Sequence, residues 1–374
     1  MYDFTIVGAG LAGSTLAYLL NNEGYNVQVI DKRNHIAGNC YTELKDNIHI
    51  HKYGPHIFHT DNKYIWDFVN KFAEFNNFIN EPLALAPDGR IYNLPFNMNT
   101  FAKIFEVTTP EEVKAKIKEE INIYQEDNPE VMNLQDQAVS MVGTSIFNLL
   151  IKGYTEKQWG TVCTNLPPEI IKRLPLRFVY NNNYFNDKYQ GIPVNGYNEI
   201  IKNMLNGIDL KLNYDYKEHE EEIKNESRYI IYTGKIDEFY DYKLGELEYR
   251  GLKFETKCLN VSNYQGNAVI NQTSIEVPYT RVIEHKHFNK DESDLTYITY
   301  EYPCESSKND IPFYPKSDKK NKELYEKYKE LSKESSNIIF AGRLGKYSYF
   351  DMDDVILDCF DTFNTIKHNI NKGE

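Results

Sequence analysis

Residues 4–13 read FTIVGAGLAG, and this stretch decides the class of fold. An apolar, strand-like run leads into a glycine-rich turn, and helix-like periodicity follows until Gly24. Residues 25–31, YNVQVID, are strand-like again. The switch from strand period to helix period and back predicts a β-α-β unit at the start of the chain.

The glycines of this turn have the GxGxxG spacing of dinucleotide-binding sites. Gly8, Gly10 and Gly13 follow a strand and open a helix, and Asp31 ends the next strand 18 residues after Gly13. In such sites the first glycine permits the tight turn, the second admits a pyrophosphate to the backbone, and the third lets helix and strand pack closely. The acidic residue accepts a hydrogen bond from a ribose hydroxyl. The sequence therefore predicts a Rossmann-type dinucleotide site.

In the rest of the chain, segments with a helical sequence pattern alternate with segments that have a strand-like pattern. A hairpin is expected near residues 81–97, helices follow, strands dominate from about residue 184, and a strand and helix close the chain. This order predicts an α/β fold: one Rossmann-like nucleotide-binding domain with an inserted helical domain and an antiparallel β-sheet domain. We expect a discontinuous nucleotide-binding domain (1–80, 209–244 and 318–374), a helical domain (98–190), and a β-sheet domain (81–97, 191–208 and 245–317).

A helix is expected to break within residues 151–160, IKGYTEKQWG. Gly153 and Gly160 interrupt an apolar periodic pattern, yet the break carries Trp159, one of only two tryptophans. Taken alone, the stretch leaves two interpretations open. Trp159 fills a gap between helix and sheet, or its ring lies against a ligand.

Composition excludes several classes of function. The net charge of −13 argues against nucleic acid and anionic membranes as partners, so an anionic ligand would need a local cationic pocket. No apolar run approaches 18 residues, and the start of the chain lacks the features of a signal peptide, so a cytoplasmic protein outside the membrane is expected. The five scattered cysteines and the histidines have no metal-site spacing, which predicts reduced thiols and no bound metal.

Two further segments resemble flavoproteins of the glutathione-reductase type. They are KRNHIAGNCY, after Asp31, and the late FAGRLGKYSYFDMDD, where such proteins point a helix at the flavin. The likeness implies FAD in place of NAD, and therefore a Rossmann-like FAD-binding domain. The expected cofactor-binding residues are Gly8, Gly10, Leu11, Ala12, Gly13, Asp31, Lys32, Gly38, Asn39, His56, Ile57, Arg343, Tyr349, Asp351 and Met352.

Nearly the whole chain resembles the bacterial UDP-galactopyranose mutase family. The segments that carry the resemblance occur in the family's order: HKYGPHIFHT, LPFNMNTF, IKGYTEKQWG, IIKRLPLRF, NNNYFNDKYQGIPVNGY, YQGNAVIN, VPYTRVIEHKHF, NDIPFYP and FAGRLGKYSYFDMDD. The resemblance implies an isomerase with a UDP-sugar substrate, FAD that is active in its reduced form, and commonly a homodimer.

The resemblance also implies roles for individual residues. Arg173 and Arg281 are expected to bind the diphosphate, Arg173 from a mobile loop of the helical substrate domain, and His56 is expected to lie beside the flavin; these three form the expected catalytic set. Arg177 and Arg250 are alternatives for which structural roles are expected. The expected substrate-binding residues are Asn80, Phe147, Tyr154, Thr155, Trp159, Arg173, Tyr184, Asn271, Arg281, Tyr314 and Tyr349.

The implied reaction is ring contraction of UDP-galactopyranose to UDP-galactofuranose. In the family, reduced FAD attacks the anomeric carbon through N5 while UDP leaves and later returns, so an external reductant is needed but no net oxidation occurs. Three alternatives stay open at this point. They are a mutase for UDP-N-acetylgalactosamine, an ordinary FAD-dependent oxidoreductase, and a UDP-sugar binding protein without activity.

Overall fold

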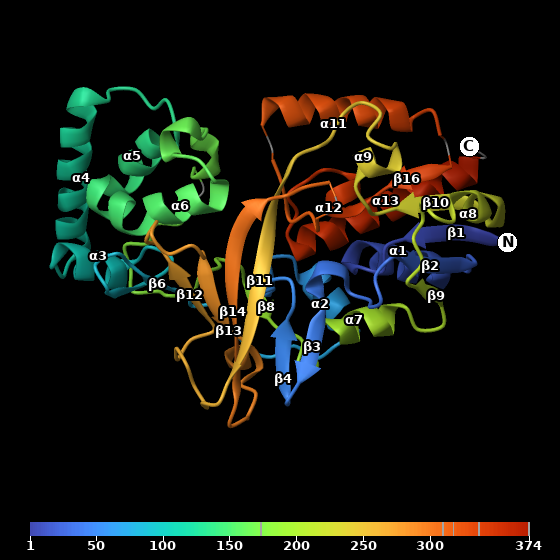
Figure 1. Cartoon of the computed structure of the whole chain (residues 1–374), viewed down its shortest axis with the longest axis horizontal. Coiled ribbons are helices and arrows are strands. Elements are labelled where there is room, and N and C mark those ends of the chain that lie inside the picture. The colour runs from blue at the N-terminus through green and yellow to red at the C-terminus, as the bar shows by residue number, and fades with distance from the viewer. Residues whose placement is uncertain (173, 309, 317, 336, 373–374) are drawn as a thin grey trace.

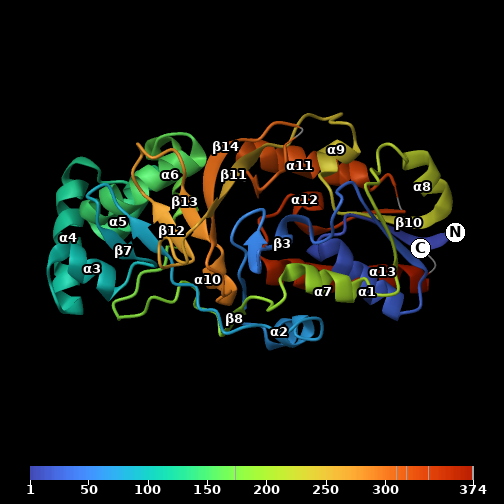
Figure 2. The same cartoon turned by 60° about the horizontal axis from the view of Figure 1, so that its bottom comes forward.

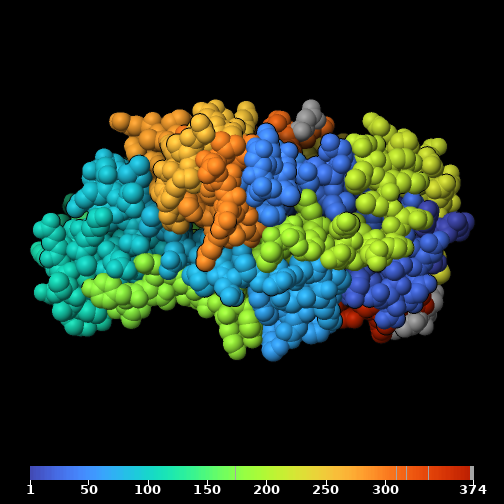
Figure 3. All heavy atoms as spheres, turned by 90° about the horizontal axis from the view of Figure 1, so that it is seen from below, coloured from blue at the N-terminus to red at the C-terminus, as the bar shows by residue number. Residues whose placement is uncertain are grey.

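The computed structural model describes residues 1–172, 174–308, 310–316, 318–335 and 337–372. Figure 1 shows three parts along the long axis: a helical part, a central β-sheet, and an α/β part that contains the first strand and the last helix. Figure 2 shows the same order after rotation, and in Figure 3 the orange region of the chain, which includes residues of the central sheet, lies between the other two parts.

The α/β part is built on a five-stranded sheet in the order β16-β10-β1-β2-β9, in which every neighbouring pair is parallel. The strands are β1 (Tyr2–Val7), β2 (Val27–Asp31), β9 (Asp209–Leu212), β10 (Ser227–Tyr232) and β16 (Ile338–Phe340). All five residues of β2 are buried, as expected for a parallel sheet that is covered on both faces.

Helices cover both faces of this sheet. On one face, α1 (Leu11–Asn22) packs against α13 (Met352–Lys372) and α7 (Tyr197–Met204). On the other, α8 (Glu220–Glu226) and α9 (Ile236–Phe239) bury Ile223 and Phe239. Further elements of this part are η1 (Gly38–Cys40), β3 (Thr42–Lys45), β4 (Ile48–His51), β5 (Phe58–Thr60), α2 (Lys63–Val69), β8 (Tyr189–Gly191), α11 (Lys319–Ser332) and α12 (Gly342–Gly345).

The central sheet has seven strands in the order β15-β11-β14-β13-β12-β6-β7. All pairs are antiparallel except β12 with β6. The strands are β6 (Leu83–Leu85), β7 (Ile91–Asn93), β11 (Tyr249–Leu259), β12 (Val269–Gln272), β13 (Arg281–Glu284), β14 (Thr296–Glu305) and β15 (Tyr314–Pro315), and the short helix α10 (Lys286–Asn289) follows β13. The hairpin expected in residues 81–97 is confirmed as β6 and β7.

The helical part has its own apolar core, to which α3, α4, α5 and α6 contribute. Thr109 and Glu112 form a reciprocal capping box with Pro110 in the first turn of α4, which explains why the helix begins there. The elements are α3 (Met98–Phe105), α4 (Pro110–Asp127), α5 (Leu134–Ile146), the π-helical turn η2 (Phe147–Ile151), α6 (Lys152–Trp159), η3 (Cys163–Asn165) and η4 (Pro168–Ile170).

Two expectations from the sequence were wrong. Residues 191–208 were assigned to the β-sheet domain, but the α7 that they contain packs on α1, because its Tyr197, Ile200 and Met204 belong to the core beside the parallel sheet. Gly153 does not break a helix; it lies inside α6, which ends at Gly160 with φ +68°. The predicted α/β fold class is confirmed.

Gly153 is needed for close packing. A Cβ at this position would lie 2.2 Å from the carbonyl oxygen of Thr273 and 2.9 Å from the nitrogen of Ile275. We predict that Gly153→Ala lowers the free energy of unfolding by about 1–3 kcal/mol, because α6 has to move away from this backbone. Urea unfolding measures the loss. Lys152→Ala, at the exposed neighbouring position of α6, is the control and should change stability by no more than about 0.5 kcal/mol; equal effects of the two substitutions would contradict the packing argument.

Candidate functional site

The glycine turn between β1 and α1 leaves no room for side chains. Gly8 has φ +112°, and a Cβ there would lie 2.1 Å from Thr233 Oγ1. A Cβ on Gly13 would lie 1.9 Å from the carbonyl oxygen of Gly8. Only glycine therefore permits the turn and the close packing of α1 on β1.

A second bare turn faces the first. Gly10 and Gly38 approach so closely that a Cβ on Gly38 would lie 3.1 Å from the Cα of Gly10, and Ala37 N–H donates to the Ala9 carbonyl at 2.8 Å. No side chain caps the start of α1, so the amides of Leu11 and Ala12 are available at its N-terminus. Two stretches of exposed backbone beside a helix N-terminus fit a dinucleotide pyrophosphate.

Asp31, at the end of β2, holds the glycine turn in place. Its carboxylate accepts from the amides of Ala9 (2.7 Å) and Arg33 (2.8 Å), which places it beside the glycine turn, as predicted. Each carboxylate oxygen keeps a further lone pair for a ribose hydroxyl. The side chain of Lys32, the residue after Asp31, is largely exposed and pairs with Glu238 at 3.3 Å.

The late segment predicted to contact the cofactor also reaches this region. Gly342 starts α12 so close to Ala12 that a Cβ on Gly342 would lie 2.8 Å from the Cβ of Ala12. The guanidinium of Arg343 donates to the carbonyls of Phe350 and Phe313 and lies 5.4 Å from the ring centroid of Tyr349. The remaining predicted cofactor residues lie nearby in the α/β part: Met352 Sδ is 3.8 Å from Cys40 Sγ, Asn39 accepts from Arg33, Asp351 precedes α13, and Ile57 is buried before β5.

A cation is fixed in the middle of the central sheet. Arg281 on β13 lies opposite Glu301 on β14 and opposite Asn271 on β12. Its Nε is 2.8 Å from Glu301 Oε1, and its terminal nitrogen donates to the Tyr154 hydroxyl at 3.1 Å. Burial opposes the charge of Arg281 and is the largest single effect, but the Glu301 carboxylate and the hydroxyls of Tyr154, Tyr314 and Tyr184 together outweigh it and raise the pKa of the guanidinium. Arg281 therefore stays charged.

Tyrosines from four segments interact electrostatically with this cation. Tyr154 comes from α6, Tyr184 from the loop before β8, Tyr314 from β15, and Tyr349 from the loop before α13. Arg281 interacts electrostatically with Tyr154, Tyr184 and Tyr314, and it opposes the rise in the pKa of Tyr349 that burial causes. The rings of Tyr314 and Tyr349 stack at 5.6 Å between centroids. Burial raises the pKa of all four hydroxyls, so each remains a hydrogen-bond donor at neutral pH.

His56 interacts electrostatically with both Arg343 and Arg281. Its Nδ1 is 2.9 Å from the carbonyl oxygen of Gly54, so Nδ1 carries the proton and Nε2 is an acceptor. Burial, together with the charges of Arg343 and Arg281, lowers the pKa of His56 to about 4. The ring is therefore neutral at physiological pH.

Other predicted substrate residues have less direct positions. Asn271 Oδ1 is buried and accepts no hydrogen bond from any residue that the structure describes. The carbonyl of Asn80 accepts from the amide of Tyr184 at 2.7 Å, which ties Asn80 to the loop before β8 that carries Tyr184. Thr155 is buried, Trp159 packs against the core of the helical part, and Phe147 is only 2% exposed within that core. Arg173 lies outside the described residues.

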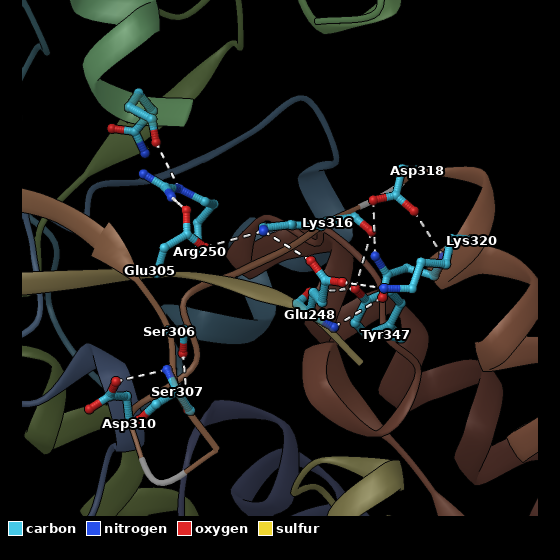
Figure 4. A network of polar contacts seen from close by, with 12 residues as sticks. Glu248, Arg250, Glu305, Ser306, Ser307, Asp310, Lys316, Asp318, Lys320 and Tyr347 are labelled. Carbon is cyan, nitrogen blue, oxygen red and sulfur yellow. Dashed lines mark hydrogen bonds and ion pairs between the residues drawn. The ribbon is translucent and has the colours of Figure 1, made fainter. Parts of the chain in front are cut away.

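The two alternative arginines have structural contacts, as expected. Arg177 donates to the carbonyls of Asn183 and Tyr184, so it supports the loop that carries Tyr184. Arg250 is 3% exposed, donates to the carbonyl of Gln158 at 3.0 Å and pairs with Glu305. Figure 4 shows how this pair continues through Lys316 to Glu248 in a network between the central sheet and the helices of the α/β part.

Glu301 is the functional residue that the sequence analysis missed. It is 1% exposed, and its Oε1 also accepts from Thr280 Oγ1 at 3.0 Å. A signal was present in LTYITYEY, because strand alternation puts Glu301 on the same face as Thr299 and Tyr297. A carboxylate on a buried strand face implies a cationic partner.

Neither a membrane span nor a metal cluster is found in the described part of the chain. None of its helices has the length and apolar character that a bilayer crossing requires. It also contains no group of three or more His, Cys, Asp or Glu side chains that could hold a metal ion.

Comparison with known proteins agrees with this geometry. A model of NAD(P)-binding Rossmann-like domains matches residues 6–72, which puts the chain among dinucleotide-binding proteins. A model of UDP-galactopyranose mutase matches residues 149–349. A solved structure of reduced UDP-galactopyranose mutase superposes with a TM-score of 0.73 at 14% identity, covering 98% of this chain and 94% of that one. The predicted Rossmann-like architecture is thereby confirmed.

Two relatives match almost end to end. A probable UDP-galactopyranose mutase from Klebsiella pneumoniae is 40% identical over 96% of this chain and 93% of its own length. A dTDP-fucopyranose mutase from Escherichia coli is 39% identical over 94% of this chain and 95% of its own. The chain therefore belongs to the UDP-galactopyranose mutase family and is an enzyme of the isomerase class, which confirms the family predicted from the sequence.

Three neutral histidines form a buried chain behind the site. The His51 amide donates to His285 Nδ1 at 3.2 Å, the His56 amide donates to His51 Nδ1 at 3.3 Å, and His285 Nε2 is 2.7 Å from Thr299 Oγ1. Burial lowers the pKa of His285 to about 3 and that of His51 well below its ordinary value. Below pH 6.5 these histidines bind protons in the unfolded chain but stay unprotonated in the folded chain.

Stability should therefore decline as the pH falls from about 6.5 towards 4. Each such histidine contributes up to about 1.4 kcal/mol per pH unit to the free energy of unfolding. We predict that His285→Gln, whose amide replaces both hydrogen bonds, makes the decline less steep than in the wild type. Urea unfolding at a series of pH values measures both slopes. Parallel curves for the two proteins would contradict the assignment of His285 as a neutral buried group.

Proposed function

We propose that the protein interconverts UDP-galactopyranose and UDP-galactofuranose by a ring contraction without net redox change. The arrangement around Arg281 carries the proposal. A guanidinium that is fixed by Glu301 and Tyr154, and that interacts electrostatically with the hydroxyls of Tyr184, Tyr314 and Tyr349, is a binding site for a diphosphate. Arg173, which lies outside the described residues, is proposed as a second cation for the same diphosphate.

The bare turns of the α/β part support FAD as the cofactor. Gly8, Gly10, Gly13 and Gly38 would admit its pyrophosphate, and Asp31 would accept from its ribose. When bound and reduced, the flavin supplies a nucleophilic nitrogen for the anomeric carbon of the sugar. The description of the solved relative as reduced supports a redox-active group. An external reductant is then needed to prepare the enzyme but is not consumed in turnover.

The overall reaction balances without an oxidant. The bond between C1 and O5 of the sugar breaks, a bond between C1 and O4 forms, and the O4 proton is lost while O5 gains one. The diphosphate has to leave C1 and return to it, so the site must stabilise its charge in the free state. Arg281 and the tyrosine hydroxyls meet this need from fixed positions.

His56 contributes a neutral acceptor. Its Nδ1 proton is directed to the carbonyl of Gly54, and its pKa of about 4 keeps Nε2 unprotonated. Nε2 can thus accept a hydrogen bond from a sugar hydroxyl without adding positive charge near Arg281 and Arg343. This role follows from its neutral ring and its electrostatic interaction with both Arg343 and Arg281.

The Escherichia coli relative favours a second candidate substrate, dTDP-fucopyranose. This sugar nucleotide shares the diphosphate and a pyranose ring, but its sugar lacks the hydroxyl at C6 and its nucleoside is thymidine in place of uridine. The proposed diphosphate site serves either substrate. A homodimer and a cytoplasmic location stay predictions from the resemblance and from the sequence.

The first experiment measures conversion by the reduced protein. Purified protein is treated with dithionite and incubated with UDP-galactofuranose or dTDP-fucofuranose, and the pyranose products are separated by chromatography. We expect UDP-galactopyranose to form only after reduction of the flavin. Faster conversion of dTDP-fucofuranose would make the fucose nucleotide the proposed substrate in place of the galactose nucleotide. Conversion of neither nucleotide by a flavin-loaded protein would contradict the proposed reaction.

Arg281→Lys tests the diphosphate site. The lysine keeps a positive charge beside Glu301 but loses the planar fork that binds phosphate oxygens. We predict a fall in kcat/KM of about 10²-fold with normal flavin absorbance. Arg90→Lys, at an exposed position that pairs with Asp88, is the control and should leave kcat/KM unchanged. Unchanged kcat/KM in Arg281→Lys would remove Arg281 from the site.

A further inference from the structure

Lys157 binds the backbone on both sides of the turn between β12 and β13. Its Nζ donates to the carbonyls of Gln272 at 2.7 Å and Tyr279 at 2.9 Å. Gln272 is the last residue of β12, and Tyr279 lies two residues before β13. Within the described part of the chain, no carboxylate lies at ion-pairing distance from this ammonium group. The charge of Lys157 is directed only at backbone carbonyls.

The three segments that Lys157 joins all carry proposed ligand contacts. Tyr154 lies one helical turn before Lys157 on α6, Asn271 is next to Gln272, and Arg281 follows Tyr279 by two residues. Arg281 already donates to the Tyr154 hydroxyl at 3.1 Å. The ammonium group of Lys157 thus links the backbone segments that carry the Tyr154 ring, the Asn271 amide and the Arg281 guanidinium. All three side chains are proposed to contact the same ligand.

Helix α6 packs closely against the turn between β12 and β13. Gly153 allows α6 to lie directly on the backbone of Thr273 and Ile275, and Thr273 Oγ1 donates to the carbonyl of Leu149 at 2.8 Å. No side chain separates the helix from the turn. A shift of α6 would therefore carry Tyr154 away from Arg281.

We propose that Lys157 is a positioning residue for nucleoside diphosphate binding, because it holds α6 against the β12–β13 turn so that Tyr154, Asn271 and Arg281 meet the same ligand. The inference rests on the proposed function, since it concerns the same diphosphate site. It assigns Lys157 no contact with the substrate.

Electrostatics support a positional role. Burial lowers the pKa of Lys157 to about 8, so the ammonium is held at a cost that no carboxylate offsets. The tyrosines nearby titrate at higher pH than Lys157, since burial raises the pKa of their hydroxyls, and Arg281 stays charged. The elements around Lys157 carry further ionisable groups. They are Lys152, Tyr154 and Glu156 on α6, Tyr279 before β13, Arg281 and Glu284 on β13, and Tyr297, Tyr300, Glu301, Tyr302, Cys304 and Glu305 on β14.

The test compares UDP binding to four flavin-loaded proteins by titration calorimetry. We expect Lys157→Met to raise the Kd for UDP by about tenfold at pH 7.5 with unchanged flavin absorbance, because the carbonyls lose their donor. Lys157→Arg, which keeps a charged donor, should recover much of the affinity. Lys152→Met, at an exposed position on the same helix, should bind UDP like the wild type.

A pH series separates positioning from general stability. Between pH 7 and pH 9 the wild type should lose affinity for UDP as Lys157 loses its proton, whereas Lys157→Arg and Lys157→Met should both change less. Binding of UDP by Lys157→Met with wild-type affinity overturns the inference alone. Failure of the flavin-loaded wild type to bind UDP overturns the proposed function and this inference with it. If Lys157→Met does not fold, the Lys157→Arg affinity and the wild-type pH series decide.

Discussion

The pairing of Arg281 with Glu301 is the interaction on which the centre of the molecule depends. A guanidinium buried in a sheet without a partner would be strongly unfavourable, and so would a carboxylate that is 1% exposed. The antiparallel register of β13 and β14 puts the two directly opposite each other. Glu301 lies beside Nε of Arg281, so a terminal nitrogen of the guanidinium remains directed at Tyr154, where the diphosphate is proposed to bind.

This local arrangement reconciles a cationic site with an acidic chain. The net charge of −13 repels anions at long range, but that repulsion is screened by salt over about 10 Å. Arg281 acts at contact distance in a buried environment, where screening is weak. Binding of an anion is therefore decided by the pocket and its desolvation, while the overall charge affects mainly the rate of approach.

What the sequence predicted well is what local backbone geometry dictates. Gly8 is required by its positive φ in the turn, Gly13 by its contact with Gly8 within the same β-α unit, and Asp31 follows from the strand that ends beside them. Glu301 and Gly153 were missed or misread because their reasons lie far along the chain, across a strand pair and at the Thr273 carbonyl. Local propensity treats a glycine in a helix as a break, whereas tertiary packing makes it the residue that allows the closest approach.

The position of α6 shows how charged side chains can fix an element that apolar packing alone leaves undetermined. The helix is short, has no side-chain N-cap and ends at Gly160, so its own hydrogen bonds specify little. Near its C-terminus Arg250 donates to the carbonyl of Gln158, where the helix dipole favours positive charge. Lys157 donates to carbonyls that the central sheet leaves unpaired at strand ends. Because apolar contacts permit sliding and these directed bonds do not, the two cations convert a packed helix into one with a defined register relative to Arg281.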